Sequence, residues 1–122
     1  MRGMMKRTTF VFLFAAVVAA LLSAGCARTL RDDPLRLGFR ASEGERWDEA
    51  VLRWETAVER SPRSVSARNN LAVAYEKKGR WEDARREYEK ALELDPSNTY
   101  VKDNFERFQE NLDAWKDADE KK

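Results

Sequence analysis

The chain has 122 residues, a formal net charge of +1 and 37% charged residues, with one cysteine and no histidine. A single thiol cannot form an internal disulfide, and the lack of histidine removes the commonest general base and metal ligand. Basic and acidic side chains are interspersed, whereas nucleic-acid binding usually needs a concentrated basic face. We therefore expect no nucleic-acid partner.

The N-terminus has the pattern of an export signal. Arg2, Lys6 and Arg7 precede an apolar run from Phe10 to Leu22. This run of 13 residues is shorter than the roughly 20 that a membrane-spanning helix needs, so a permanent transmembrane segment is the weaker alternative. The sequence therefore predicts that residues 1–25 are a signal peptide.

Small residues lead from this run into the single cysteine. Ala24, Gly25 and Cys26 resemble the end of the bacterial lipobox, in which a diacylglycerol is attached to the thiol and the chain is cut just before the cysteine. The resemblance implies a lipoprotein with a diacylglycerol and an N-linked acyl chain on Cys26, and we expect no other cofactor. One acyl chain anchors only marginally, so two or three chains make the attachment to the membrane lasting.

The residue after the cysteine bears on location. In similar lipoproteins an Asp at this place holds the protein in the inner membrane, and this chain has Ala27. The resemblance therefore implies a bacterial envelope protein, in the outer membrane and facing the periplasm if the host has two membranes. Loss of residues 1–25 leaves 97 residues with 20 basic and 22 acidic side chains. Residues 26–33 are then the lipidated N-terminus and linker.

An internal repeat with an offset of 34 residues organises the rest of the chain. Eight positions are identical when residues 31–64 are laid over residues 65–98. They pair Leu37 with Leu71, Arg46 with Arg80, Trp47 with Trp81, Ala50 with Ala84, Glu55 with Glu89, Ala57 with Ala91, Glu59 with Glu93, and Pro62 with Pro96. Such an ungapped match indicates two copies of one structural unit.

The period and the matched residues resemble the tetratricopeptide repeat (TPR), a pair of antiparallel helices about 34 residues long. The second copy fits the family pattern at Asn70, Leu71, Ala72, Tyr75, Gly79, Trp81, Ala84, Tyr88, Ala91, Asp95 and Pro96. The resemblance implies an all-α, TPR-like helical solenoid. It has two helix-turn-helix repeats, at residues 34–64 and 65–98, and a C-terminal capping helix with a frayed tail at residues 99–122.

Local chemistry predicts the same helices. Asp33 followed by Pro34 favours a helix start, because the carboxylate can accept from a first-turn N–H and proline presets φ. Gly44 and Gly79 are expected to end the first helix of each copy, and the proline late in each copy ends the second. A small residue is expected where two helices approach closely, at Gly38 and its counterpart Ala72.

Each second helix has an apolar stripe, with residues at spacings of three and four. The stripe residues are Ala50, Trp54, Ala57 and Val58 in the first copy and Ala84, Tyr88, Ala91 and Leu92 in the second. We expect these side chains to form the core.

After Pro96 the pattern predicts one long helix that covers the last repeat and shows charge outward. Residues 118–122 are expected to fray. About three repeats are generally needed for a stable stack, and this chain has two and a half. One hypothesis is therefore a homo-oligomer formed through the first repeat, where Leu35 and Phe39 have no preceding helix to cover them.

The leading functional hypothesis is a membrane-anchored protein-binding module, an adaptor or scaffold. The resemblance implies a concave groove lined by the first helices, which takes a peptide or a partner helix. The candidate groove residues are Leu35, Phe39, Asn69, Val73, Glu76, Lys77, Tyr100, Asp103 and Arg107. Phe39 and Val73 occupy equivalent places and would form an apolar strip. The alternative is that Phe39 packs on a neighbouring helix or the linker.

Two other functional classes are alternatives to a protein-binding module. Lipoproteins with these repeats serve in pilus secretin biogenesis and outer-membrane protein insertion, so a structural accessory subunit of such a complex is the main alternative. An enzyme is not expected. The cysteine is assigned to lipid, and the sequence has no glycine-rich phosphate loop, metal-ligand cluster or nucleophile motif.

Overall fold

The protein is described by a computed structural model, which covers residues 33–121. The predicted signal peptide and the lipidation site Cys26 lie outside the described residues. Residues from Pro34 onward form one compact unit. Its described part contains five α-helices and no strand: α2 (Pro34–Glu43), α3 (Trp47–Arg60), α4 (Val65–Lys77), α5 (Trp81–Leu94) and α6 (Thr99–Asp119).

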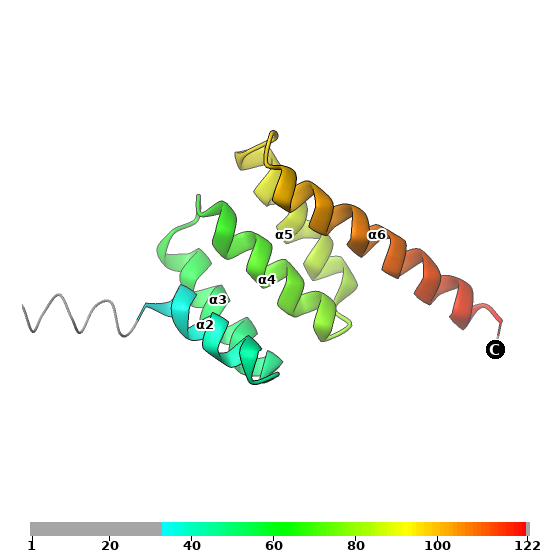
Figure 1. Cartoon of the computed structure of the whole chain (residues 1–122), viewed down its shortest axis with the longest axis horizontal. Helices are drawn as coiled ribbons and strands as arrows, with labels where there is room; N and C mark the ends of the chain where they lie inside the picture. The colour runs from blue at the N-terminus through cyan, green and yellow to red at the C-terminus, as the bar shows by residue number, and fades with distance from the viewer. Residues whose placement is uncertain (1–32, 122) are drawn as a thin grey trace, which may run out of the picture. The chain divides into compact units, whose positions relative to one another are not determined.

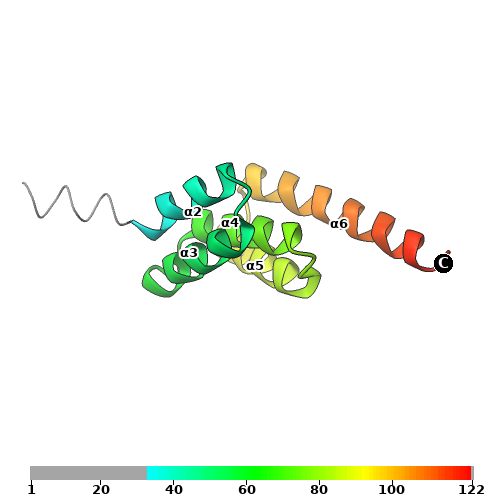
Figure 2. The same cartoon turned by 90° about the horizontal axis from the view of Figure 1, so that it is seen from below.

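The helices are stacked in pairs. Helix α2 packs on α3 and α4 packs on α5, while α3 contacts α4 and α6 contacts α5. Figure 1 looks onto α2, α4 and α6, which run side by side, and Figure 2 shows α3 and α5 in a second layer behind them. The predicted all-α, TPR-like solenoid is therefore confirmed.

The core is formed by the predicted stripes of the second helices. Trp54 and Tyr88, the equivalent aromatic residues of the two copies, are both buried, as are the alanines that flank them in α3 and α5. Burying a large apolar side chain contributes roughly 1.5–3 kcal/mol, so this row of side chains accounts for much of the stability of the stack. The expectation that the aromatic residues pack in the core is confirmed.

Gly38 lies at a close approach of α2 and α3. It is buried, and a Cβ built on it would overlap the indole ring of Trp54. The same indole donates from Nε1 to the backbone oxygen of Leu35 at 3.1 Å, which holds the ring against α2. The close approach predicted at this position is confirmed.

The turns inside the two helix pairs have matching hydrogen bonds but different residues in the left-handed conformation. Arg46 N donates to the oxygen of Ala41, and Arg80 N to the oxygen of Tyr75, each at 2.9 Å. In the second pair Gly79 has φ +69°, as expected. In the first pair α2 ends at Glu43 and Gly44 follows it, as expected, but the residue with positive φ is Glu45, at 55°. The glycine lies one place before the position that needs it.

This displacement predicts opposite effects for two substitutions. Glu45→Gly should raise the free energy of unfolding by about 0.5–1 kcal/mol because it relieves left-handed strain, whereas Gly79→Ala should lower it by about 1 kcal/mol. The space beside Gly79 is open, so its change acts on the backbone alone. Urea unfolding of both variants measures the difference. Shifts of the same sign in both would contradict the assignment.

Helix α6 covers the open side of α5. The side chain of Asn98 accepts a hydrogen bond from the backbone N of Val101 at 3.1 Å, which fixes the start of the helix. Its apolar face packs through Phe108 and Leu112, both buried. The helix continues to Asp119.

Candidate protein-binding groove

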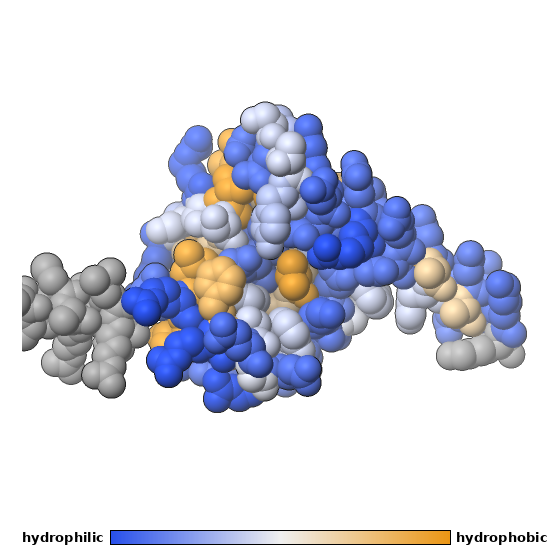
Figure 3. Space-filling model, in the orientation of Figure 1, coloured by the Kyte–Doolittle hydropathy of each residue, from blue (hydrophilic) through white to orange (hydrophobic). Residues whose placement is uncertain are grey.

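A hollow opens on the face formed by the first helices. It has a volume of about 160 Å³ and is lined by Phe39, Val65, Ser66, Asn69, Asn70, Asn98, Tyr100 and Val101. Figure 3 shows apolar surface gathered between α2 and α4 on this face, with hydrophilic surface around it. No charged side chain lines the hollow.

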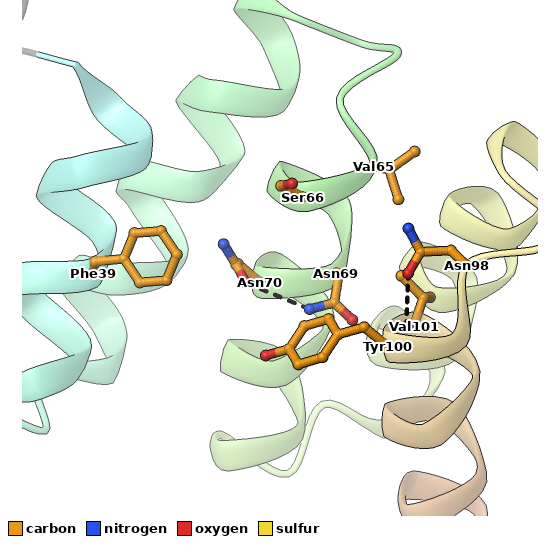
Figure 4. Close-up of a pocket in the computed structure, with 8 residues that line it drawn as sticks. All are labelled: Phe39, Val65, Ser66, Asn69, Asn70, Asn98, Tyr100 and Val101. Carbon is orange, nitrogen blue, oxygen red and sulfur yellow. Dashed lines mark hydrogen bonds between the residues drawn. The ribbon is translucent and has the colours of Figure 1, made fainter.

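Two aromatic side chains stand on opposite sides of this hollow. Phe39 projects from α2 toward α4, and Tyr100 lies across α4 from the start of α6 (Figure 4). Phe39 is 47% exposed and Tyr100 is 66% exposed, although the edge of Phe39 also packs on Trp54 with ring centroids 5.6 Å apart. The two rings can therefore enclose an apolar group placed between them.

The floor of the hollow is held by a row of amides. Arg107 donates to Asn104 Oδ1 at 2.9 Å, Asn104 Nδ2 donates to Asn69 Oδ1 at 3.0 Å, and Asn69 Nδ2 donates to Asn70 Oδ1 at 3.4 Å. Asn69 and Asn104 are both buried. This row links α6 to α4 and fixes the distance between Tyr100 and the rest of the hollow.

The predicted groove residues take three kinds of position. Phe39, Asn69 and Tyr100 line the hollow. Leu35 and Val73 are partly buried against the core, so the apolar strip predicted from Phe39 and Val73 has one exposed member and one half-covered member.

The charged members of the predicted groove lie outside the hollow. Glu76 accepts from Tyr88 at 3.3 Å and from Asn111 at 3.0 Å, so it joins α4 to α5 and α6. Lys77 places its Nζ 5.9 Å from the ring centroid of Trp47. Asp103 is exposed on α6, as is the other charged residue predicted on that helix, Arg107.

Five residues of the hollow were missed in the sequence. Val65 and Ser66 begin α4, Asn98 precedes α6, Val101 lies in its first turn, and Asn70 follows the predicted Asn69. The groove prediction used equivalent places on the first helices and left out the helix starts. The N-cap pattern at Ser64 and Asn98, whose side chains accept from Ala67 N and Val101 N, could have located those starts.

Two buried tyrosines tie the layers together through carboxylates. The Tyr75 hydroxyl donates to Glu55 Oε1 at 2.6 Å, and the Tyr88 hydroxyl donates to Glu76 Oε2. Burial raises the pKa of both phenols well above the ordinary value, and the hydrogen bond to Glu55 and the charge of Glu76 raise it further.

These shifts predict a loss of stability at alkaline pH. Above about pH 10 tyrosines of the unfolded chain lose their protons while Tyr75 and Tyr88 keep theirs, so the free energy of unfolding should fall as pH rises. The double variant Tyr75→Phe, Tyr88→Phe should show a shallower decline. Urea unfolding at several pH values between about 8 and 11 measures both slopes. Equal slopes in the two proteins would contradict the assignment.

Two kinds of site were sought among the described residues, a metal-binding cluster and a membrane-spanning helix. No group of histidine, cysteine, aspartate or glutamate side chains within residues 33–121 could hold a metal ion. Within the same range, no helix combines the length and the apolar character that a bilayer crossing requires. The face of α2, α4 and α6 contains the hollow, which is small, partly aromatic and lined by no charged side chain.

The comparisons with known proteins agree with the helical stack. The family model of the tetratricopeptide repeat matches residues 35–99, which is more than half of the chain. A search of curated proteins finds no match. The matched segment contains the two helix pairs α2–α3 and α4–α5, and TPR domains generally bind protein partners. The chain belongs to the tetratricopeptide repeat family.

Proposed function

We propose that the chain is a membrane-tethered protein-binding module of the bacterial cell envelope, with no catalytic activity. A segment of a partner protein binds in the hollow between α2, α4 and α6. This proposal rests mainly on two exposed aromatic side chains, Phe39 and Tyr100. They stand on either side of the hollow, which no charged side chain lines.

The lining of the hollow favours one kind of segment. Because no charged side chain lines it, a charged group from the partner would lose its hydration without gaining a counter-charge. An aliphatic or aromatic side chain between the two rings gains apolar contact area instead. The partner segment is therefore one that presents an uncharged side chain, whether its backbone is extended or helical.

Site-specific photo-crosslinking in cells tests the location of binding. A photoreactive phenylalanine analogue is placed at Tyr100, and the matched control places it at Leu52, which is 59% exposed on α3 and outside the hollow. We expect a protein adduct from position 100 that is missing from position 52. The same adducts from both positions, or none from either, would contradict the proposal.

The anchor is tested separately. The apolar run that ends in Ala24, Gly25 and Cys26 supports attachment of acyl chains to the thiol. We expect the protein recovered from cells to begin at Cys26 with the added mass of a diacylglycerol and an acyl chain, and the Cys26→Ser variant to lose its association with the outer membrane. A chain with an unmodified Cys26 thiol would overturn this part of the proposal.

A second candidate is a structural accessory subunit that self-associates within an outer-membrane or pilus and secretion complex. The observation that favours it is Leu52, a large apolar side chain that the first helix pair exposes away from the hollow. Light scattering of the purified protein distinguishes the two candidates. A monomer mass across a wide concentration range would contradict self-association, whereas a mass that rises with concentration would support it.

A further inference from the structure

We propose that the hollow recognises a hydrogen-bond acceptor of its partner, namely a carbonyl oxygen, and that Arg107 fixes this preference from outside the hollow. The proposal rests on the proposed function and deepens it. It names the polar group that a partner segment presents beside its uncharged side chain. Arg107 acts as a positioning residue, because it reaches the hollow only through other side chains.

Among the described asparagines that line the hollow, only Asn70 has an unpaired side-chain atom. The amide of Asn98 donates to Asp95 and accepts from the first turn of α6. Asn69 accepts from Asn104 and donates to Asn70. The Nδ2 of Asn70 is buried and has no hydrogen-bond partner within residues 33–121. Such a donor costs free energy until an acceptor pairs with it.

This nitrogen faces the hollow. In Figure 4 it points toward Phe39 and away from Asn69. The Phe39 ring is 47% exposed, and exposed side chains change rotamer within nanoseconds. A turn of the ring therefore admits an acceptor to Asn70 Nδ2 from the side of the hollow.

The direction of the amide row decides which end of Asn70 faces the hollow. A guanidinium only donates, so Asn104 must turn its oxygen to Arg107 and its Nδ2 to Asn69. Asn69 then has its Nδ2 left for Asn70, which must accept through its oxygen. The nitrogen of Asn70 is therefore the end that remains for a partner.

The hydroxyl groups of the hollow do not select between acceptors and donors. Those of Ser66 and Tyr100 can each donate and accept, and they rotate to suit the group beside them. The Nδ2 of Asn70 only donates. The hydrogen-bond polarity of the hollow therefore depends on this nitrogen and, through the row, on Arg107.

A free carbonyl oxygen implies an extended partner segment. In an α-helix the carbonyl oxygens before the last turn are already bonded within the helix, whereas an extended chain leaves its own unpaired. Such a segment can place an apolar side chain between Phe39 and Tyr100 and a neighbouring backbone carbonyl against Asn70. The unpaired donor therefore favours an extended backbone over a helical one.

Two small ring compounds of opposite polarity test the proposal. Pyridine only accepts a hydrogen bond and pyrrole only donates one, and both are flat and uncharged at neutral pH. The protein recovered from cells is placed in lipid nanodiscs, and the affinity of each compound is measured by saturation-transfer NMR. The variant Phe39→Glu, Tyr100→Glu is the blank for binding to lipid. We expect pyridine to bind about fivefold more tightly than pyrrole. Equal affinities, no binding of either compound, or tighter binding of pyrrole would overturn the proposal.

Reversal of the row separates its polarity from its structural role. Arg107→Glu replaces a donor with an acceptor, so the three amides should turn over and Asn70 should present its oxygen. Pyrrole should then bind about fivefold more tightly than pyridine. The matched control, Lys102→Glu, makes the same change of charge at an exposed position of α6 outside the row and should keep the wild-type preference. A folded Arg107→Glu protein that also keeps it would overturn the role of Arg107.

Two further variants decide the matter if Arg107→Glu does not fold, which circular dichroism establishes first. Asn70→Asp has the shape of asparagine but no donor, so it still accepts from Asn69 and should reverse the preference. Arg107→Met leaves the row without a fixed direction, so pyridine and pyrrole should bind with similar affinities. The wild-type preference in either variant would contradict the proposal.

The polarity of the hollow and the proposed function can fail separately, because these compounds need no partner protein. A protein adduct from position 100 together with equal binding of pyridine and pyrrole would retain the hollow as the binding site and overturn its polarity. A preference for pyridine without any adduct would support the polarity and contradict the binding of a partner.

Discussion

Gly38→Ala is expected to lower the free energy of unfolding by about 3 kcal/mol, although it adds only one methyl group. The added Cβ would occupy the position of the Trp54 indole. The ring would have to move away from α2, and its hydrogen bond to the Leu35 oxygen would be lost with it. Urea unfolding followed by circular dichroism measures the change.

The second repeat supplies the control for this prediction. There the equivalent pair is Ala72 and Tyr88, both buried, so the second repeat combines a methyl group at this position with a smaller aromatic residue. The double variant Gly38→Ala, Trp54→Tyr should therefore recover part of the stability that Gly38→Ala loses. A stable Gly38→Ala protein, or a double variant no better than the single one, would show that the helices are not held this closely.

Phe108→Ala is expected to lower the free energy of unfolding by about 4 kcal/mol. Phe108 is fully buried where α6 meets α5, with ring centroids 5.5 Å from Tyr88 and 6.2 Å from Trp81. Removal of the ring leaves a cavity between the last two helices and uncovers the second repeat. Thermal and urea unfolding measure the loss.

Trp115 offers a matched control on the same helix. It also contacts Trp81, at 5.8 Å, but it is 49% exposed. Trp115→Ala should cost about 1 kcal/mol because much of its surface is already in water. If the two variants lose similar stability, or if Phe108→Ala loses less, α6 does not act as the cap of the stack.

The fold could be predicted from the sequence because the determining signals are local and repeated. The offset of 34 residues aligns Trp54 with Tyr88 and Gly38 with Ala72, and each pair occupies an equivalent place in the structure. In the first copy the glycine of the turn stands one position early, at Gly44. The offset of 34 residues pairs Glu45 with Gly79, and these two residues adopt positive φ, so the repeat and not the glycine indicates the left-handed position.

The hollow could be predicted only in part, because its shape depends on how α6 crosses α4. Equivalent places on the first helices gave Phe39, Asn69 and Tyr100. The amide row from Asn104 through Asn69 joins residues 35 positions apart, and the period alone does not show which of their atoms meet. The helix starts that complete the hollow become neighbours only once α4 and α6 are packed.

Affinity capture of the lipidated protein from crosslinked envelopes tests the central claim most directly. Wild type is compared with Phe39→Glu, Tyr100→Glu and with the control Leu52→Glu, Trp115→Glu, which changes two similarly exposed apolar residues outside the hollow. Circular dichroism first establishes that both variants are folded. The account predicts a partner protein, identified by mass spectrometry, that wild type and the control retain and the hollow variant loses. Equal recovery with all three proteins would contradict binding in the hollow.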